Sequence, residues 1–334
     1  LVDGGDGDVG ASTGGLRRET VHQQAGDEAA HCDEERDGPG ALEAEYLAHA
    51  SLVERRRRGE AAEDASLSWR DRSGRELDPV SDLAPYDMVA LSPDGRFAAV
   101  GIITRQAGTW DLWIVDLARN FRTRFTIDPA DDFDMVWSGD SRGVYFGSDR
   151  EDEVAIFYKE VGSPDPPQNV FQTGRNIRLW DVTDDGKTII YSEGGEGTNW
   201  DLWSAEVDGQ SEPRLLRRTA EHDVLGQFSP DEKWLAFGSR ESGTWQVYVA
   251  PWPSMSPITQ VSTTSGTWSR WTKEGRELVY LDQSGSLLTV SMTPDGDRMT
   301  VGTPEPLFEI AAPVLEAVYW TVSADGEKFL TVNT

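Results

Sequence analysis

Four aspartates gather within one seven-residue stretch and could bind a cation. Asp128, Asp131, Asp132 and Asp134 offer carboxylate oxygens, which are the ligands that Ca²⁺ prefers. Their spacing is not that of an EF-hand, because Phe133 stands where such a loop has its sixth-position glycine. The cluster is therefore the candidate metal site, with Ca²⁺ as its ion, and no other cofactor is expected.

Three polar residues form a second candidate site. Asp181, Gln227 and Arg270 each stand two residues before one copy of a recurring turn, and an apolar residue follows each of them. Because side chains alternate along a strand, the polar residues should face away from the packed surface. The six residues at this position of the repeat are Ala90, Val136, Asp181, Gln227, Arg270 and Thr321. We interpret the polar three as a ligand-binding group, with a structural polar network as the alternative.

Most catalytic signatures are absent from the sequence. It has no kinase glycine-rich loop, His-Arg-Asp or Asp-Phe-Gly, so this chain is not itself a kinase. The one Gly-x-Ser-x-Gly match, residues 10–14, lies in a glycine-rich tail and not between a strand and a helix, as a nucleophile elbow requires. His222 is the only histidine after residue 65, so a conventional zinc site with two imidazoles is not expected.

A short turn recurs six times and sets the architecture. It begins with Ser or Thr, has a carboxylate at its third position and often ends in Gly, which is the chemistry of tight hairpins. We expect the carboxylate to accept hydrogen bonds from backbone N–H groups of the turn. The copies are Ser92–Gly95, Ser138–Ser141, Thr183–Gly186, Ser229–Glu232, Thr272–Gly275 and Ser323–Gly326, and their starts are 46, 45, 46, 43 and 51 residues apart.

Apolar strands precede and follow each turn, four to a unit. A period in the forties with four short strands indicates a β-propeller, and six turns indicate six blades. The last unit has only two strands, Ala317–Val322 and Glu327–Val332, before the chain ends. We predict that Ser66–Asp71 and Arg75–Leu77 complete it, which would close the ring and remove exposed sheet edges. The predicted fold is all-β, a six-bladed propeller whose last blade is closed from both ends of the chain.

The repeated turn and strands such as Trp110–Asp116 and Trp200–Trp203 resemble the WD40-like repeats of TolB-type propellers, over about residues 66–334. This resemblance implies a bacterial, periplasmic or extracytoplasmic protein. Similar propellers form periplasmic TolB of the Tol–Pal system, the sensor half of receptor-like Ser/Thr kinases, and the propeller half of prolyl-oligopeptidase-type peptidases. The segment Leu67–Glu76 most resembles the kinase-linked group, and no α/β domain of the TolB kind is recognised before the propeller.

Charge and composition narrow the range of partners. The net charge of −28 argues against binding nucleic acid or anionic membranes. No run of 18 apolar residues predicts a transmembrane helix, so we expect no direct membrane insertion. Twelve of the 13 tryptophans follow residue 100, which fits packing between blades better than a ligand cage. We expect a monomer.

Residues 1–65 differ from the rest. They are rich in Gly, Asp, Glu, Ala and Arg, they hold the single cysteine, Cys32, and they begin with Leu. We expect a disordered or mis-started tail, with one short helix within residues 41–65 and no signal peptide.

The sequence favours a non-enzymatic recognition or scaffold module of the bacterial cell envelope. A protein or peptide would bind through the loop face or the channel, and the module could be the detached sensor domain of a Ser/Thr kinase or a Tol–Pal-type partner. The alternative is a propeller hydrolase or lyase that uses channel carboxylates, with or without Ca²⁺.

Overall fold

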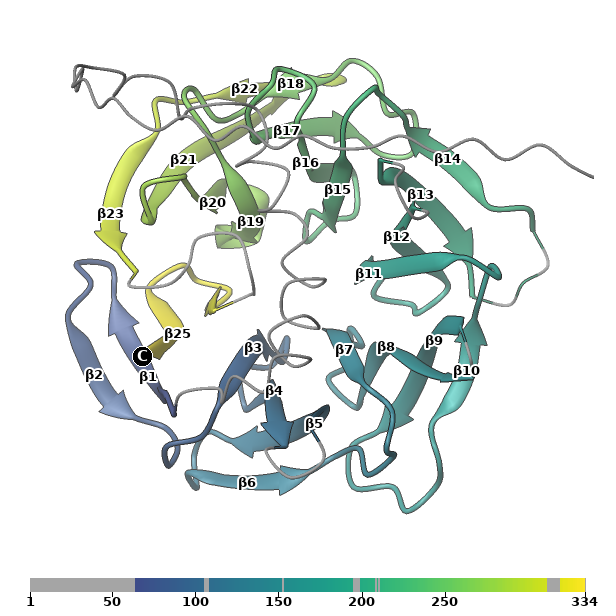
Figure 1. Cartoon of the computed structure of the whole chain (residues 1–334). Helices are drawn as coiled ribbons and strands as arrows, with labels where there is room; N and C mark the ends of the chain where they lie inside the picture. The colour runs from purple at the N-terminus through teal and green to yellow at the C-terminus, as the bar shows by residue number, and fades with distance from the viewer. Residues whose placement is uncertain are drawn as a thin grey trace, which may run out of the picture. The chain divides into compact units, whose positions relative to one another are not determined.

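Six antiparallel sheets surround a central axis in the computed structural model, as six blades of a propeller (Figure 1). The structure describes residues 64–104, 108–151, 153–194, 199–207, 209, 211–310 and 319–333. The expectations for residues 1–63, including Cys32 and the Gly-x-Ser-x-Gly match, lie outside these residues. Within them, no helix is long and apolar enough to cross a membrane.

Blades 1 to 4 each contain four strands in chain order, from the innermost strand outward. Blade 1 consists of β3 (Tyr86–Leu91), β4 (Phe97–Thr104), β5 (Thr109–Asp116) and β6 (Phe121–Arg124). Blade 2 consists of β7 (Asp132–Trp137), β8 (Gly143–Glu151), β9 (Glu153–Glu160) and β10 (Gln168–Phe171). Blade 3 consists of β11 (Asn176–Val182), β12 (Thr188–Gly194), β13 (Asp201–Glu206) and β14 (Arg214–Arg217). Blade 4 consists of β15 (Asp223–Phe228), β16 (Trp234–Ser239), β17 (Gln246–Pro251) and β18 (Thr259–Gln260).

Blade 5 has a divided outer edge. Its strands are β19 (Thr267–Thr272), β20 (Glu277–Leu281), β21 (Ser286–Asp295), β22 (Arg298–Val301) and β23 (Glu305–Glu309), with the short 3₁₀ turn η1 (Lys273–Gly275) after β19. The long β21 pairs with β22 along one half and with β23 along the other. Sequence analysis did not identify β23.

Blade 6 is closed by strands from both ends of the propeller, as predicted. Its order from the outside inward is β2 (Glu76–Pro79), β1 (Ser66–Asp71), β25 (Lys328–Asn333) and β24 (Trp320–Val322). The pairing of β1 with β25 runs from Ser66–Asn333 to Asp71–Lys328. The all-β, six-bladed fold is therefore confirmed, and each sheet is paired from the axis to the rim.

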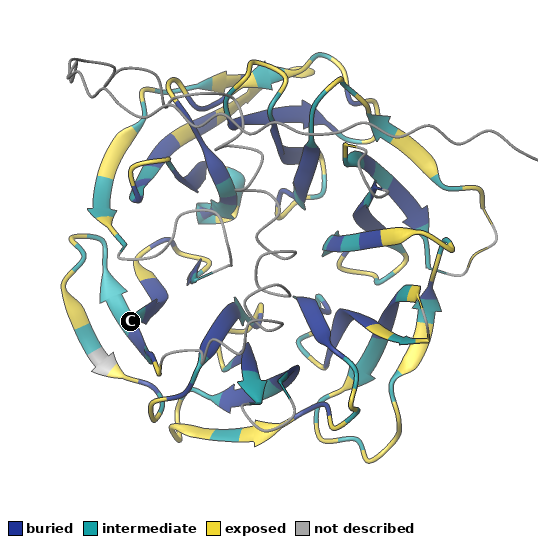
Figure 2. Ribbon diagram, viewed as in Figure 1, coloured by how far each residue is buried: buried dark blue, intermediate teal, exposed yellow. Residues whose placement is uncertain are grey.

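The cores lie between blades. Figure 2 shows the buried residues concentrated on the inner strands and the exposed ones on the rim. Each seam has its own apolar cluster; for example, Met88 and Leu112 of blade 1 pack with Phe133 and Phe146 of blade 2. These flat, interdigitated contacts hold each blade at a fixed angle to the next.

Five of the six turns have the predicted hydrogen bonding. In the first, Ser92 Oγ donates to Asp94 Oδ1 at 2.7 Å, and the Arg96 N–H donates to the same oxygen at 3.0 Å. The fifth copy differs because Lys273 and Glu274 both have positive φ, and Thr272 donates instead to Glu277. The carboxylate at the third position of the turn was expected to accept backbone N–H groups. This expectation is wrong at Glu274, whose carboxylate accepts a hydrogen bond from Arg276.

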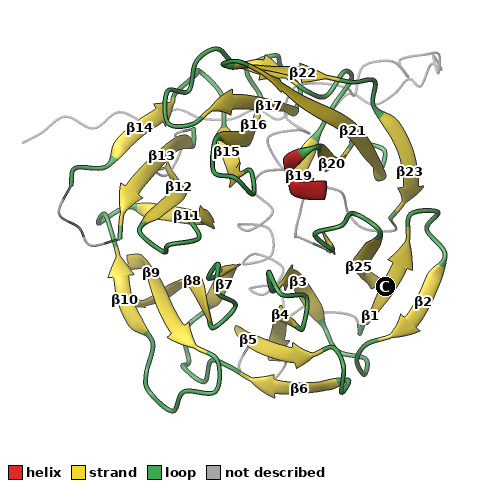
Figure 3. Cartoon of the chain, turned by 180° about the vertical axis from the view of Figure 1, so that it is seen from behind, coloured by secondary structure: helices red, strands yellow, loops and turns green. Residues whose placement is uncertain are grey.

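The turn between the innermost and second strands thus lies on one face of the propeller in every blade, which is called here the turn face. Neighbouring turns are linked across the blades. The Asp94 N–H donates to Ser141 Oγ, and the Asp184 N–H donates to Glu232 Oε1. The opposite face, where the second and third strands connect, is called here the loop face. Figure 3, turned by 180°, shows these connections from the other side.

Candidate functional site

Asp181, Gln227 and Arg270 lie on three successive innermost strands, β11, β15 and β19. The Gln227 amide donates to the Ser269 carbonyl at 2.5 Å and accepts from Arg270 Nη1 at 3.0 Å. Asp181 Oδ2 accepts the backbone N–H of Phe228 at 2.8 Å. The structure therefore brings the three predicted residues together along the channel wall of blades 3 to 5.

The three polar residues are only partly buried. Asp181, Gln227 and Arg270 are all of intermediate exposure, whereas Val182 and Phe228, which follow two of them, are buried. The alternation places Asp181, Gln227 and Arg270 toward the channel, and it places Val182 and Phe228 toward the neighbouring blade.

Burial raises the pKa of Asp181 to about 7, against the backbone N–H groups of Phe228 and Val182 and the positive charge of Arg270, which lower it. Burial also lowers the pKa of Arg270 to about 10, although the Asp181 charge opposes this shift. A carboxyl group that titrates near neutrality beside an arginine can exchange a proton or change its charge when a ligand arrives. The chemistry open to this group is charge-assisted binding or proton transfer.

Bulges on the inner strands position these side chains. Strand pairing is irregular between Val224 and Gln227 and between Thr267 and Arg270. Inside these bulges Leu225 and Trp268 have positive φ values of 58° and 49°, which bulky side chains rarely adopt. Bulges are frequent beside binding sites, because they redirect a side chain without ending the strand. The strained backbone thus sets the direction of Gln227 and Arg270.

An aromatic cluster adjoins the site, and sequence analysis missed it. Trp180 of β11 and Trp268 of β19 meet edge to face, with ring centroids 6.2 Å apart. The Trp180 Nε1–H donates to Ser192 Oγ at 2.7 Å, and the Arg178 guanidinium lies 5.5 Å from the Trp180 ring centroid. Trp180 precedes Asp181 by one position, and Trp268 precedes Arg270 by two. This closeness in sequence to the predicted site residues could have indicated the aromatic cluster.

The structure does not bring the four aspartates of the candidate metal site together as one set of ligands. Asp132 pairs with Arg150 at 2.6 Å, and Asp134 pairs with Arg178 of the next blade at 2.5 Å. Asp131 Oδ1 accepts the Trp110 N–H, and Asp128 Oδ1 accepts the Ala130 N–H. Among the described residues, no three carboxylate, imidazole or thiol groups converge as metal ligands. A regular strand would place Asp132 and Asp134 on one face, but β7 has a bulge between Phe133 and Val136 in which Asp134 has a positive φ of 52°, and the two carboxylates pair with different arginines.

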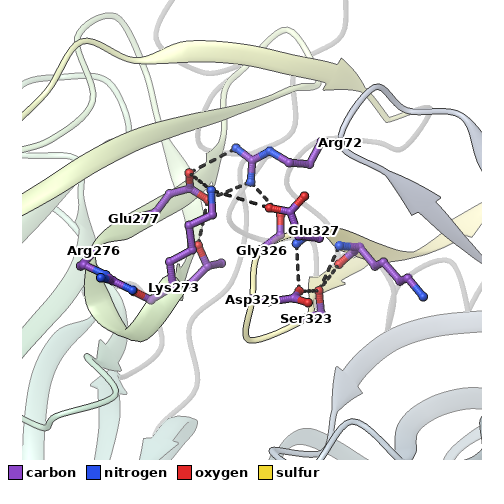
Figure 4. A network of polar contacts seen from close by, with 10 residues as sticks. Arg72, Lys273, Arg276, Glu277, Ser323, Asp325, Gly326 and Glu327 are labelled. Carbon is purple, nitrogen blue, oxygen red and sulfur yellow. Dashed lines mark hydrogen bonds and ion pairs between the residues drawn. The ribbon is translucent and has the colours of Figure 1, made fainter.

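A second polar network joins blades 5 and 6 (Figure 4). Glu277 accepts from Arg72 at 2.9 Å and from Lys273 at 3.0 Å, while Arg72 also donates to the Gly326 carbonyl at 2.7 Å. Burial of Glu277 raises its pKa, but these hydrogen bonds outweigh it and lower the pKa to about 2. Since Arg72 lies in the turn after β1, the network ties the closing strands to blade 5 and is structural.

The comparisons with known proteins identify the fold. No protein-family model matches the sequence, and no curated protein matches it. A putative TolB from Agrobacterium tumefaciens is similar in structure, with a TM-score of 0.65 and 17% identity, covering 82% of this chain and 99% of that one. TolB from Acinetobacter baumannii has a TM-score of 0.54 and 17% identity, covering 74% of this chain and 65% of that one.

An enzyme is also similar in structure. An oligogalacturonate lyase in complex with manganese has a TM-score of 0.52 and 16% identity, covering 72% of this chain and 68% of that one. At these identities the likeness establishes the fold alone. The chain therefore has the six-bladed propeller fold of TolB-type proteins.

Proposed function

We propose that this propeller is a non-enzymatic recognition module of the bacterial cell envelope, which binds a protein or peptide at its channel. The observation that carries this proposal is the partly buried Asp181–Gln227–Arg270 group on three adjacent inner strands. An acid, an amide and a guanidinium held on a rigid wall can together recognise the N–H, C=O and charged groups of a peptide. The TolB-type fold supports a protein partner and a periplasmic or extracytoplasmic location.

Site-directed photocrosslinking tests this proposal. A benzoylphenylalanine would replace Gln227 in the full chain, and as a control it would replace Thr123 on the exposed rim strand β6. After irradiation in an envelope extract of the source bacterium, we expect one discrete adduct from position 227 and none from position 123. Arg270→Gln in the labelled chain should remove the adduct. The same adduct from both positions, or its persistence with Arg270→Gln, would contradict the proposal.

The second candidate is a hydrolase or lyase, and the pKa of about 7 at Asp181 favours it specifically. A carboxyl group with such a pKa is poised as a general base or acid at neutral pH. This candidate is tested by incubating the chain with oligogalacturonate, with and without Mn²⁺, and with peptide substrates. Product formation that Asp181→Asn abolishes would support an enzyme, whereas unchanged substrates would favour the recognition module.

A further inference from the structure

A pocket of about 760 Å³ opens on the turn face at the seam between blades 6 and 1. Trp69, Leu91 and Leu117 lie in its lining, and they are three of the five partly buried residues that pack against the apolar cluster of this seam. Thr321 and Trp271 also line it, and Arg96 and Lys328 stand at its exposed edge. None of Asp181, Gln227 and Arg270 contributes to the lining, although Trp271, which follows Arg270, does.

Two other seams show what fills this place in the repeat. The residue just before the turn is Trp137 in blade 2 and Trp271 in blade 5. The Trp137 Nε1–H donates to the Ala90 carbonyl of blade 1 at 3.0 Å, and the Trp271 Nε1–H donates to the Gln227 carbonyl of blade 4 at 3.3 Å. Each indole thus enters the seam and binds the preceding blade two residues before its turn.

An aromatic ring of the preceding blade completes the filling. Phe97, five residues after the start of its turn, stacks on Trp137 with centroids 6.3 Å apart. Trp234 holds the same position in blade 4, and Trp271 packs against its cluster. Both seams are therefore filled by an indole against a second aromatic ring.

The remaining filled seams use other groups at this place. Tyr145 and Tyr158 pack with Val182 between blades 2 and 3, and Phe228 of blade 4 belongs to one apolar cluster with Ile190 and Leu202 of blade 3. The Arg72–Glu277 network occupies the seam between blades 5 and 6.

At the seam of blades 6 and 1 both aromatic positions are lost. Leu91 stands where Trp137 and Trp271 stand, and Lys328 stands where Phe97 and Trp234 stand. The carbonyl of Thr321 is the counterpart of the Ala90 and Gln227 carbonyls, and within the described residues no side chain donates to it. At this seam, therefore, the carbonyl that would accept an indole N–H is present, but the repeat supplies no indole at the position of Leu91.

We propose that this pocket binds a tryptophan side chain presented by a peptide segment of a partner protein. The indole would take the place that Trp137 fills in its seam, with its N–H toward the Thr321 carbonyl and its ring against Trp69. The volume exceeds what one side chain needs and leaves room for flanking residues.

Charge indicates what those flanking residues are. Asp94 and Asp325 at the pocket already accept hydrogen bonds inside their own turns. At the exposed edge, Arg96 lies 4.0 Å from Asp94 Oδ2, and Lys328 is the second cation, so an acidic residue beside the tryptophan and near Lys328 would be favoured. A short acidic peptide that contains one tryptophan is the expected class of ligand.

The test uses the full chain and the peptide acetyl-Glu-Trp-Glu-amide, made with 5-fluorotryptophan and followed by ¹⁹F NMR. We expect saturable binding, and no displacement of the fluorinated peptide when the matching Glu-Ala-Glu peptide is added as a competitor. Leu91→Trp should fill the place with the chain's own indole, weaken binding at least tenfold and raise Tm. Ala118→Trp, at an exposed lining position, should also weaken binding at least tenfold without altering the core.

Specific outcomes would overturn the proposal. These are absence of binding to the unmodified chain, unchanged binding in a folded Ala118→Trp variant, or equal binding of the Glu-Ala-Glu peptide. Binding of N-acetyltryptophanamide as tight as that of the peptide would also overturn it, because the pocket would then suit a small aromatic molecule. Asp181→Asn should leave the affinity unchanged, which separates this site from the channel.

Discussion

At the scale of single residues, the channel group combines opposite charges in a place that water reaches poorly. Asp181 and Arg270 each shift toward their neutral forms because burial penalises charge. The hydrogen bonds from Arg72 and Lys273 outweigh burial at Glu277 and lower its pKa, whereas burial raises the pKa of Asp132 although it pairs with Arg150. A carboxyl group with a raised pKa is a candidate for ligand binding when it also faces a channel, as Asp181 does.

The raised pKa of Asp181 predicts that the stability of the fold depends on pH. Since the pKa of Asp181 is raised in the folded state, its proton favours folding, and stability falls as pH rises from about 4 toward about 7. Asp181→Asn should flatten this fall. The measurement is the free energy of unfolding in urea at pH 5 and pH 8, with Asp297→Asn on the exposed β21–β22 turn as the control. A fall of equal size in both variants would contradict the assignment.

At the scale of elements, the turns act as interlocking units. Their fourth residue has positive φ in every copy, and it is Gly in four of them. The two exceptions, Ser141 and Glu232, are the residues whose side chains accept a backbone N–H from the preceding blade. The bond between blades offsets the cost of a left-handed conformation in a non-glycine residue.

The turns also supply a matched pair of substitutions. Asp140 accepts from Ser138 Oγ at 2.7 Å and from the Arg142 N–H at 3.0 Å, whereas Glu274 makes neither bond in its turn. Asp140→Ala should lower the free energy of unfolding by about 1–2 kcal/mol, and Glu274→Ala should change it by less than about 0.5 kcal/mol. Urea unfolding measures both, and equal losses would show that the turn carboxylate is not the stabilising group.

At the scale of the whole molecule, the ring is closed at one place, the pairing of β1 with β25 in blade 6, which is called here the joint. Strand β1 pairs with β25 along six residues, and Arg72 reaches across from the β1–β2 turn to Glu277 of blade 5. Other blades are continuous in sequence, so only this joint can open without breaking a covalent hairpin.

Acid should weaken this joint. The pKa of Glu277 is lowered to about 2 from 4.5, so its contribution is complete above pH 4.5 and is lost as pH falls toward 2. This shift sets an upper bound of about 3 kcal/mol. Glu277→Gln should remove that part of the acid dependence, whereas Arg276→Gln on the exposed neighbour should not. Thermal unfolding between pH 2.5 and pH 6 gives the comparison.

Deletion of residues 64–79 tests the joint directly. It removes β1 and β2 and leaves Leu330 and the edge of β25 uncovered, so we expect a lower Tm and association between chains. Light scattering and circular dichroism would detect both changes. Adding residues 64–79 as a separate peptide should restore part of the Tm; a deleted chain that stays monomeric with unchanged Tm would contradict the closure.

The sequence by itself determined the fold, because the six turns and their strands repeat at regular spacing and each blade is local in sequence. It also determined that Asp181, Gln227 and Arg270 share one position, since period two and the repeat together define an inner wall. Tertiary structure alone decided that their side chains meet, because the bulges at Leu225 and Trp268 redirect them. It likewise gave the four aspartates of the 128–134 stretch different partners, because the bulge at Asp134 separates its carboxylate from that of Asp132, and Asp128 and Asp131, in the loop before the strand, accept backbone N–H groups. Tertiary structure was also needed to find the pocket beside Leu91, because the missing indole is recognised only when the six blades are compared side by side.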